Sequence, residues 1–183
     1  MKTLAYHILD ITENAVTAKA DGIEISIDEN TAKDYYEIII KDNGTGMTKE
    51  TLRQVSDPFY TSRTTRRVGL GIPLFRQNAL QSGGRFSIVS KPGKGTTVKA
   101  RFGLSHLDRP PVGNLQSAIL HLIFVNPEIH FVYQHKTAQD QFSFDTNEIK
   151  KAVGDIPLNH PKVKPLLQEM IQENLKHINA INS

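Results

Sequence analysis

The sequence predicts an α+β fold in two layers, with helices on one face of a mixed, mostly antiparallel sheet and a small α/β extension after it. Three observations carry this prediction. Apolar residues recur every three or four positions in some segments and every second position in others. These segments follow the order helix, two strands, short helix, loop, helix, two strands, which is typical of one sheet covered by helices. Pro110 and Pro111 then break the pattern, because consecutive prolines cannot continue a strand ladder.

The first part of the chain has two strand pairs and three helices in its pattern. Helical spacing of apolar residues predicts an amphipathic helix over residues 3–20, with a stop signal at Asp21-Gly22. Alternation of apolar and polar residues predicts strands, and chain order pairs them as hairpins. The remaining elements expected here are strands 23–27 and 36–41, a short helix from residue 48, a long loop over 56–69, a helix over 70–82, and strands 86–89 and 96–102.

The two prolines divide the chain into predicted units at residues 1–106 and 110–183. The second unit is expected to form a small α/β module that docks on the sheet of the first. We expect it to offer a surface to a protein partner or to a second copy of the chain. Its expected elements are a helix over 112–125, strands over 129–135 and 141–145, a short helix over 146–152 and a terminal helix over 162–180.

Composition excludes several classes of protein. The 183 residues include no cysteine, which rules out disulfides, cysteine-bound metal sites and a thiol nucleophile. The N-terminal residues lack the pattern of a signal peptide. The longest apolar stretch, residues 118–125, is far shorter than the roughly 20 residues that span a bilayer. A cytoplasmic protein without a membrane segment is therefore expected.

The small net charge of +3 conceals a basic region. Between Arg53 and Arg101 the chain has ten basic residues and one acidic residue, Asp57. This excess predicts an anionic ligand. Aromatic residues that could stack on bases are few in this region, so nucleic acid is not the expected ligand.

Four short segments, in a fixed order and on fixed elements, carry the predicted chemistry. Each one alone has a plain structural explanation, such as a solvated helix residue, a common turn or a strand-start threonine. Together they are specific. The segments are Glu13-Asn14 inside the first helix, Asp42-Asn43-Gly44-Thr45-Gly46 after a strand, Gly69-Leu70-Gly71 opening a helix, and Gly93-Lys94-Gly95-Thr96 opening a strand.

The residue types suit a bound nucleotide. Asn14 offers a neutral amide oxygen of the kind that Mg²⁺ accepts while keeping its waters. Asp42 can accept a hydrogen bond from the exocyclic amine of adenine, and Gly44 and Gly46 allow close approach of the backbone. Gly71 lies at a helix start, where free N–H groups and the helix dipole favour phosphate.

In this order the segments resemble the Bergerat-fold ATP-binding domain, which DNA gyrase, the ninety-kilodalton heat-shock chaperones, sensor histidine kinases and the MutL mismatch-repair proteins share. The resemblance covers about residues 1–104. The stretch around Glu13-Asn14 is most similar to the MutL type. The stretch from Asp57 to Arg63, and Gly83-Gly84 after the next helix, resemble a histidine kinase instead.

The resemblance implies ATP as ligand and Mg²⁺ as metal, held by Asn14. It implies that Glu13 orients or deprotonates an attacking water, although a surface glutamate is an equal alternative. It also implies that Arg63 supplies positive charge to the γ-phosphate. The nucleotide-binding residues implied are Asn14, Asp42, Gly44, Gly46, Met47, Gly69, Leu70, Gly71 and Thr96.

Three functions follow from the resemblance. The first is a Mg·ATP-dependent ATPase or protein kinase that acts on a separate partner in signal transduction, similar to stand-alone kinases of the anti-sigma type. Because only six residues precede His7, a phospho-acceptor is expected on another protein. The alternative is an ATP-sensing interaction module with little or no turnover. A MutL-like DNA-repair fragment is less favoured, because the 75 residues from Arg109 onward are too few for a typical transducer domain.

Overall fold

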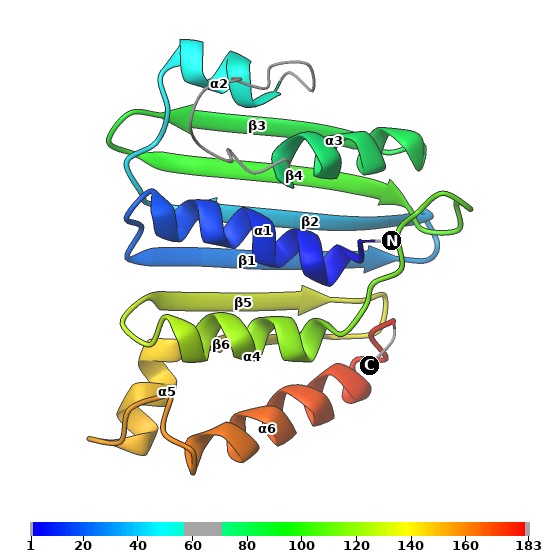
Figure 1. The fold of residues 1–183 in the computed structure, drawn as a ribbon. Helices are drawn as coiled ribbons and strands as arrows, with labels where there is room; N and C mark the ends of the chain where they lie inside the picture. Colours follow the sequence, from blue (N-terminus) through cyan, green and yellow to red (C-terminus); the bar gives the residue numbers. More distant parts are fainter. Residues whose placement is uncertain (1, 57–70, 182–183) are drawn as a thin grey trace.

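Six strands form one open sheet in the order β3-β4-β2-β1-β5-β6 (Figure 1). The computed structural model describes residues 2–56 and 71–181. The predicted α+β class, with helices on one face of a mixed sheet, is confirmed. In chain order the elements are α1 (Leu4–Thr17), β1 (Gly22–Asn30), β2 (Tyr35–Asp42), α2 (Lys49–Ser56), α3 (Gly71–Gln81), β3 (Arg85–Lys91), β4 (Gly95–Gly103), α4 (Leu115–Val125), β5 (His130–Lys136), β6 (Gln141–Asp145), α5 (Thr146–Val153) and α6 (Val163–His177).

The C-terminal extension continues the sheet of the first part. β5 pairs with β1 in parallel, with Ile25 opposite Tyr133, and β6 then pairs antiparallel with β5. The other neighbours, β1 with β2, β2 with β4 and β3 with β4, are antiparallel. The predicted division into units at 1–106 and 110–183 stays a prediction, and both stretches contribute strands to one sheet.

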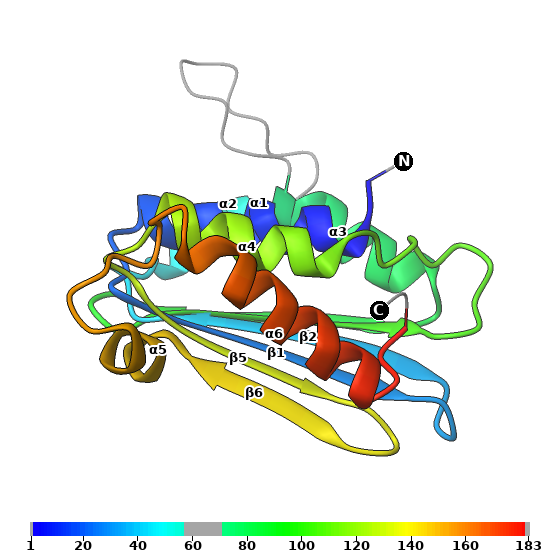
Figure 2. The ribbon, with the colours of Figure 1, turned by 90° about the horizontal axis from the view of Figure 1, so that it is seen from below.

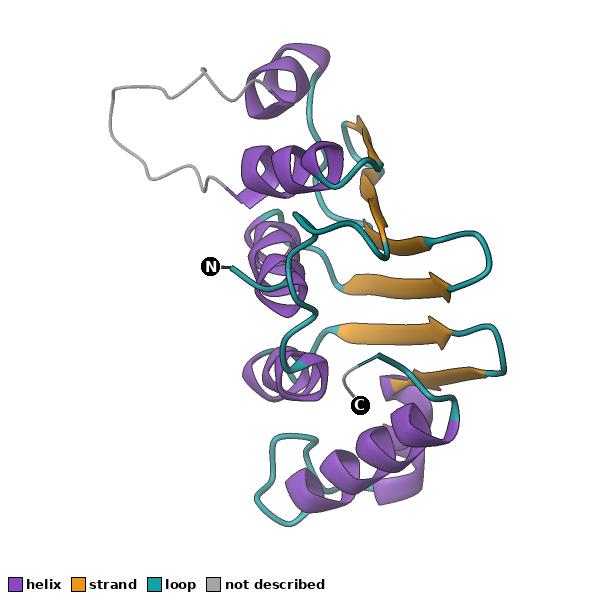
Figure 3. Cartoon of the chain, turned by 90° about the vertical axis from the view of Figure 1, so that its right-hand side faces the viewer, coloured by secondary structure: helices purple, strands orange, loops and turns teal. Residues whose placement is uncertain are grey.

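The core lies between the sheet and a single helix layer (Figures 2 and 3). Alternate residues of the strands, such as Ile25, Ile38 and Ala100, face α1, α3 and α4 and are fully buried. In the described ranges no helix covers the opposite face of the sheet. None of the helices in these ranges combines the length and the hydrophobicity that a membrane crossing requires.

Two helices end earlier than their sequence patterns predict, and for the same reason. α1 ends at Thr17 because Lys19 takes a left-handed conformation with φ 58° and Ala20 N–H donates to the Ala15 carbonyl. α6 ends at His177 with Asn179 in the same conformation at φ 52°. Glycine usually makes such an end and asparagine sometimes does, so Lys19 is the less predictable of the two stops.

Candidate functional site

The carboxylate of Asp42, at the end of β2, is held at one oxygen. Its Oδ1 atom accepts hydrogen bonds from the backbone N–H of Gly44 at 2.8 Å and of Thr96 at 3.3 Å. Among the described residues no hydrogen bond reaches Oδ2, and the side chain is only partly buried. The Oδ2 atom can therefore accept a hydrogen bond from a ligand, while the backbone fixes the orientation of the carboxylate.

Ser90 on β3 links the two glycine-containing turns. Its hydroxyl accepts a hydrogen bond from the N–H of Met47 at 2.8 Å, lies 2.9 Å from the Thr96 hydroxyl, and donates to the Gly95 carbonyl at 3.0 Å. Sequence reasoning missed Ser90. The available signal was its place directly opposite Thr96 in the predicted hairpin.

Contacts within the protein explain why glycine occupies positions 44 and 46. A Cβ atom on Gly44 would lie 2.7 Å from the Ala18 carbonyl oxygen, and one on Gly46 would lie 2.1 Å from that of Lys91. Gly46 also has φ +66°, in the left-handed region that favours glycine. These contacts explain the two glycines without a ligand. The expected close approach of their backbone to adenine stays a prediction.

Backbone hydrogen bonds join two of the four predicted segments to each other and to the end of α1. The N–H of Thr45 donates to the Ala18 carbonyl at the end of α1 at 2.8 Å. The N–H of Gly93 donates to the Thr45 carbonyl, also at 2.8 Å. The end of α1 and the turns at 42–47 and 90–96 therefore form one continuous rim.

Asn14 and Glu13 are both exposed on α1, but they face different sides. His7, on the same helix, packs against α3, with its ring 5.2 Å from that of Phe75 and its Nε2 atom 2.8 Å from the Asn78 amide nitrogen. At 3.6 residues per turn, Asn14 projects within roughly 20° of the direction of His7, and Glu13 about 120° from it. Asn14 thus lies on the α3 side of α1, and Glu13 does not. The expected role of Glu13, to orient or deprotonate an attacking water, stays a prediction.

Asp10, one helical turn before Asn14, meets the first residue of α3. A Cβ atom on Gly71 would lie 3.1 Å from the Cβ of Asp10 and 3.5 Å from its Oδ2. The first N–H groups of a helix have no partner within it and attract negative charge. Sequence reasoning missed Asp10, although its four-residue spacing from Asn14 places both on one helix face.

The remaining predicted residues of this region lie outside the described part of the chain. These are Arg63, Gly69 and Leu70. Gly71 is described, and it opens α3 as predicted.

Part of the basic excess lies on the uncovered face of the sheet. There Glu37 on β2 accepts from Arg101 at 2.7 Å and from Lys99 at 2.9 Å, and Arg85 lies 4.0 Å away. Burial raises the pKa of Glu37, but the hydrogen bonds from Arg101 and Lys99 outweigh burial and leave the pKa below its ordinary value. These three cations serve the sheet, so the basic region is not a single phosphate site.

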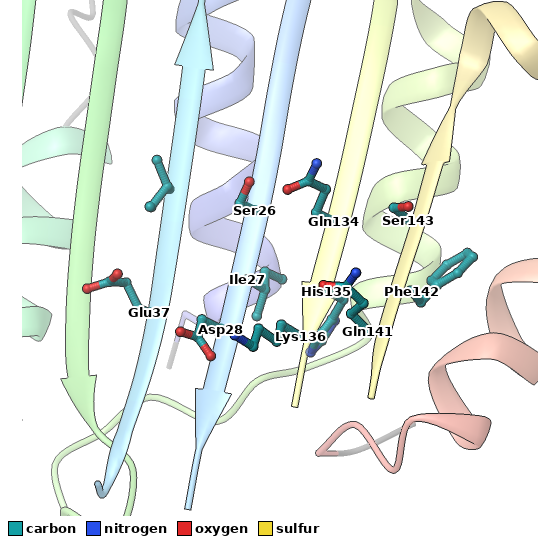
Figure 4. Close-up of a pocket in the computed structure, with 11 residues that line it drawn as sticks. Ser26, Ile27, Asp28, Glu37, Gln134, His135, Lys136, Gln141, Phe142 and Ser143 are labelled. Carbon is teal, nitrogen blue, oxygen red and sulfur yellow. The ribbon is translucent and has the colours of Figure 1, made fainter. Parts of the chain in front are cut away.

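A shallow hollow of about 220 Å³ lies on the same uncovered face, over β1, β2, β5 and β6 (Figure 4). Its polar side chains stand at strand positions that alternate with the buried core. They include Ser26, Asp28, Gln134, Lys136 and Ser143. None of the predicted nucleotide-binding residues that the structure describes lines this hollow.

The two histidines of β5 lie on opposite faces of the sheet, as their odd spacing predicts. His135 is buried and bonded to Glu29 at 2.6 Å and to the Tyr133 hydroxyl at 2.7 Å. His130 is partly exposed and pairs with Asp145 at 2.8 Å.

The donor chemistry near α3 fits a Mg²⁺ ion. The exposed Asn14 amide is a neutral oxygen donor on the α3 side of α1. Mg²⁺ binds through one or two protein oxygens and keeps water and phosphate oxygens in its other positions. Among the described residues no group of three acidic or histidine side chains is arranged as a complete metal site.

Comparison with known proteins identifies the family. The sequence profile of the family described as histidine kinase-, DNA gyrase B- and HSP90-like ATPase matches residues 2–106. The crystal structure of the N-terminal domain of a DNA repair protein shares the fold, with a TM-score of 0.52 and 16% identity over 78% of this chain and 52% of that one.

Two bacterial relatives are similar in sequence to this region. A putative sensor protein of Shewanella frigidimarina is 34% identical over 104 residues, which is 55% of this chain. Sensor protein SrrB of Staphylococcus aureus is 38% identical over 97 residues, or 49% of this chain. The matched region is only 16% of the length of each relative. Because the family profile matches more than half of its residues, the chain belongs to the histidine kinase-, DNA gyrase B- and HSP90-like ATPases.

Proposed function

We propose that the chain binds Mg·ATP between the start of α3 and the rim that the end of α1 and the turns at 42–47 and 90–96 form. We propose further that it transfers the γ-phosphate to water or to a separate protein. The observation that carries this proposal is the half-satisfied carboxylate of Asp42. Gly44 and Thr96 hold its Oδ1 atom, which leaves Oδ2 to accept from the adenine amine.

The residues of α1 would serve the phosphates. Asn14 would hold Mg²⁺, which offsets the charge on the phosphate oxygens when it is bound. Asp10 is the carboxylate nearest the start of α3, and we assign it the role of orienting the attacking oxygen. Attack on the γ-phosphorus forms one P–O bond and breaks the bond to the bridging oxygen, so that ADP leaves.

A signalling role is the one that the relatives favour. Both bacterial relatives are named as sensor proteins. We therefore propose that the partner of this chain is a protein of a signalling system, acting in trans.

Calorimetric titration with Mg·ATP tests the nucleotide site. Asp42→Asn keeps an oxygen for the N–H groups of Gly44 and Thr96 but places an amide where adenine needs an acceptor. We expect its affinity to fall by about ten- to a hundred-fold. Asp155→Asn, at an exposed position beyond α5, is the control and should bind as the wild type does. Unchanged affinity in Asp42→Asn would rule out this adenine site.

A single-turnover experiment with γ-labelled ATP then separates the possible outcomes of binding. Release of labelled phosphate indicates hydrolysis, and label on a co-purified protein indicates transfer. Binding with neither product would contradict the proposed transfer and favour the sensing module.

A further inference from the structure

Lys2 lies directly on the Asp10 carboxylate. Its ammonium is 2.9 Å from Asp10 Oδ2 and 4.4 Å from the centre of the Tyr6 ring. The Asp10 side chain is 21% exposed and that of Lys2 is 40% exposed. An exposed ion pair of this kind adds little stability. The relevant effect of the Lys2–Asp10 pair is that it fixes the position of the Asp10 carboxylate.

The paired oxygen is the one nearest α3. Asp10 Oδ2 would be 3.5 Å from a Cβ atom on Gly71, the first residue of that helix. Lys2 and Asp10 therefore lie together beside the first residue of α3, and free N–H groups at a helix start favour phosphate. A carboxylate with free rotamers would sample several directions here, and the ammonium selects one of them.

The position of Lys2 is set by the segment that follows Pro110. The N–H of Leu4 donates to the Pro111 carbonyl at 2.9 Å, and the N–H of Ala5 donates to that of Val112 at 2.8 Å. These bonds satisfy donors at the start of α1 that have no partner within the helix. They fix the residues next to Lys2, so its side chain starts from a defined place.

We propose that Lys2 is a positioning residue, which holds the Asp10 carboxylate against the start of α3 in the geometry that phosphoryl transfer requires. This inference rests on the proposed function, in which Asp10 orients the oxygen that attacks the γ-phosphorus. Lys2 acts through Asp10 and not through the nucleotide.

Steady-state kinetics of Lys2→Met and Lys2→Arg, alone and with Asp10→Asn, test this role. We expect Lys2→Met to lower kcat about five-fold with KM for ATP unchanged, and Lys2→Arg to retain most of the activity. In the Asp10→Asn background, Lys2→Met should cause no further loss, since the two residues act as one unit. Lys33→Met, in the exposed turn between β1 and β2, is the control and should match the wild type.

A second readout examines the ion pair without nucleotide. The lysines are labelled by reductive ¹³C-methylation, which retains their charge, and their NMR signals are compared in the wild type and in Asp10→Asn. We expect the Lys2 signal to move and the Lys33 signal to stay. An unmoved Lys2 signal would overturn the proposal at its structural basis.

The kinetic outcomes separate this inference from the function on which it rests. Wild-type turnover with an equally active Lys2→Met overturns the role of Lys2 alone. A raised KM, or an equal loss in the Asp10→Asn background, also overturns it, because either result means that Lys2 acts on the nucleotide directly. A wild type that fails to bind or turn over Mg·ATP defeats the proposed function and this role with it.

Discussion

Two acidic residues of α1 lie close in sequence but face different surroundings. Asp10 abuts Gly71 at the start of α3, while Glu13 is exposed and projects about 120° from the side of His7 that packs on α3. The side chains of adjacent helix residues project about 100° apart, whereas those of residues four apart project in nearly the same direction. The Glu13-Asn14 pair that stands out in the sequence is thus less suited to shared chemistry than Asp10 with Asn14.

We predict that Asp10→Asn lowers the rate of γ-phosphate transfer by about a hundred-fold, the smaller end of the usual contribution of a positioned base. The affinity for Mg·ATP should change little, because in this proposal Asp42, and not Asp10, binds the adenine ring. Phosphate release under single turnover measures the rate, and calorimetry measures the affinity. Glu13→Gln is the matched control and should retain activity within about three-fold. The reverse pattern would return the role to Glu13.

At the residue scale, the sequence could predict chemistry but not contact. Asp42 is recognisable from its place at a strand end before two glycines, and no hydrogen bond from the described residues reaches its Oδ2 atom. The roles of Ser90 and Asp10 depend on neighbours 43 and 61 positions away, Met47 and Gly71. No local pattern encodes such pairs.

The elements themselves follow closely from periodicity, because each buries one face or one stripe. Both hairpins form in the expected order, with Ile23, Ile25 and Ile27 buried as their alternation predicts. Helix ends were less predictable, since Lys19 and Asn179 provide left-handed stops without glycine. The ionic grouping across β2, β4 and β3 was not predictable either, because strand register decides which charges face each other.

The ion pairs of Glu37 with the cations of β3 and β4 lead to a prediction about stability. Glu37 is 7% exposed and is the shared partner of Lys99 and Arg101, with Arg85 at 4.0 Å. Glu37→Gln should lower the free energy of unfolding at pH 7 by about 2 kcal/mol, in the range of hydrogen bonds to charged groups. Urea unfolding measures this difference. Glu24→Gln, whose pair with Lys41 is about half exposed, is the control and should cost less than about 1 kcal/mol.

The sign of the pH effect follows from the lowered pKa of Glu37 in the folded chain. A carboxyl whose pKa falls on folding adds stability above its unfolded pKa of about 4.3, and this stability is lost as the pH falls through the folded value. The gap between wild type and Glu37→Gln should therefore be complete at pH 7 and narrow below about pH 4. A gap that is the same at pH 7 and pH 3 would show that the carboxylate charge is not its source.

At the scale of the whole molecule, one pairing joins the two parts of the chain. β1 has β2 on one side and β5 on the other, with the parallel register running from Gly22 opposite His130 to Asp28 opposite Lys136. Parallel neighbours need a crossover connection, and here it runs from β2 to the end of α4. Sequence patterns cannot specify a partner so distant along the chain. The sequence therefore predicts a boundary at Pro110-Pro111. In the structure, strands from both sides of these prolines belong to one sheet.

This pairing predicts the behaviour of a shortened chain. A fragment of residues 1–106 would leave β1 as an edge strand with unpaired backbone groups, and would strip α4 from α1. Leu4 and Ala5 would also lose the carbonyl partners that Pro111 and Val112 provide at the start of α1. We expect this fragment to lack a cooperative thermal transition by circular dichroism and to aggregate, because its exposed strand can pair with other chains.

Co-expression of residues 1–106 with residues 107–183 is the matched control. The second fragment restores β5 to β1, so the two should co-purify and unfold in one transition near that of the intact chain. If residues 1–106 alone unfold cooperatively at the midpoint of the full chain, the first part is an independent domain and β5 adds nothing to its stability. If the fragments fail to associate, the seven-residue register between β1 and β5 is too weak to hold the halves without the covalent link. Only association with a restored transition supports a single folding unit built across the two prolines.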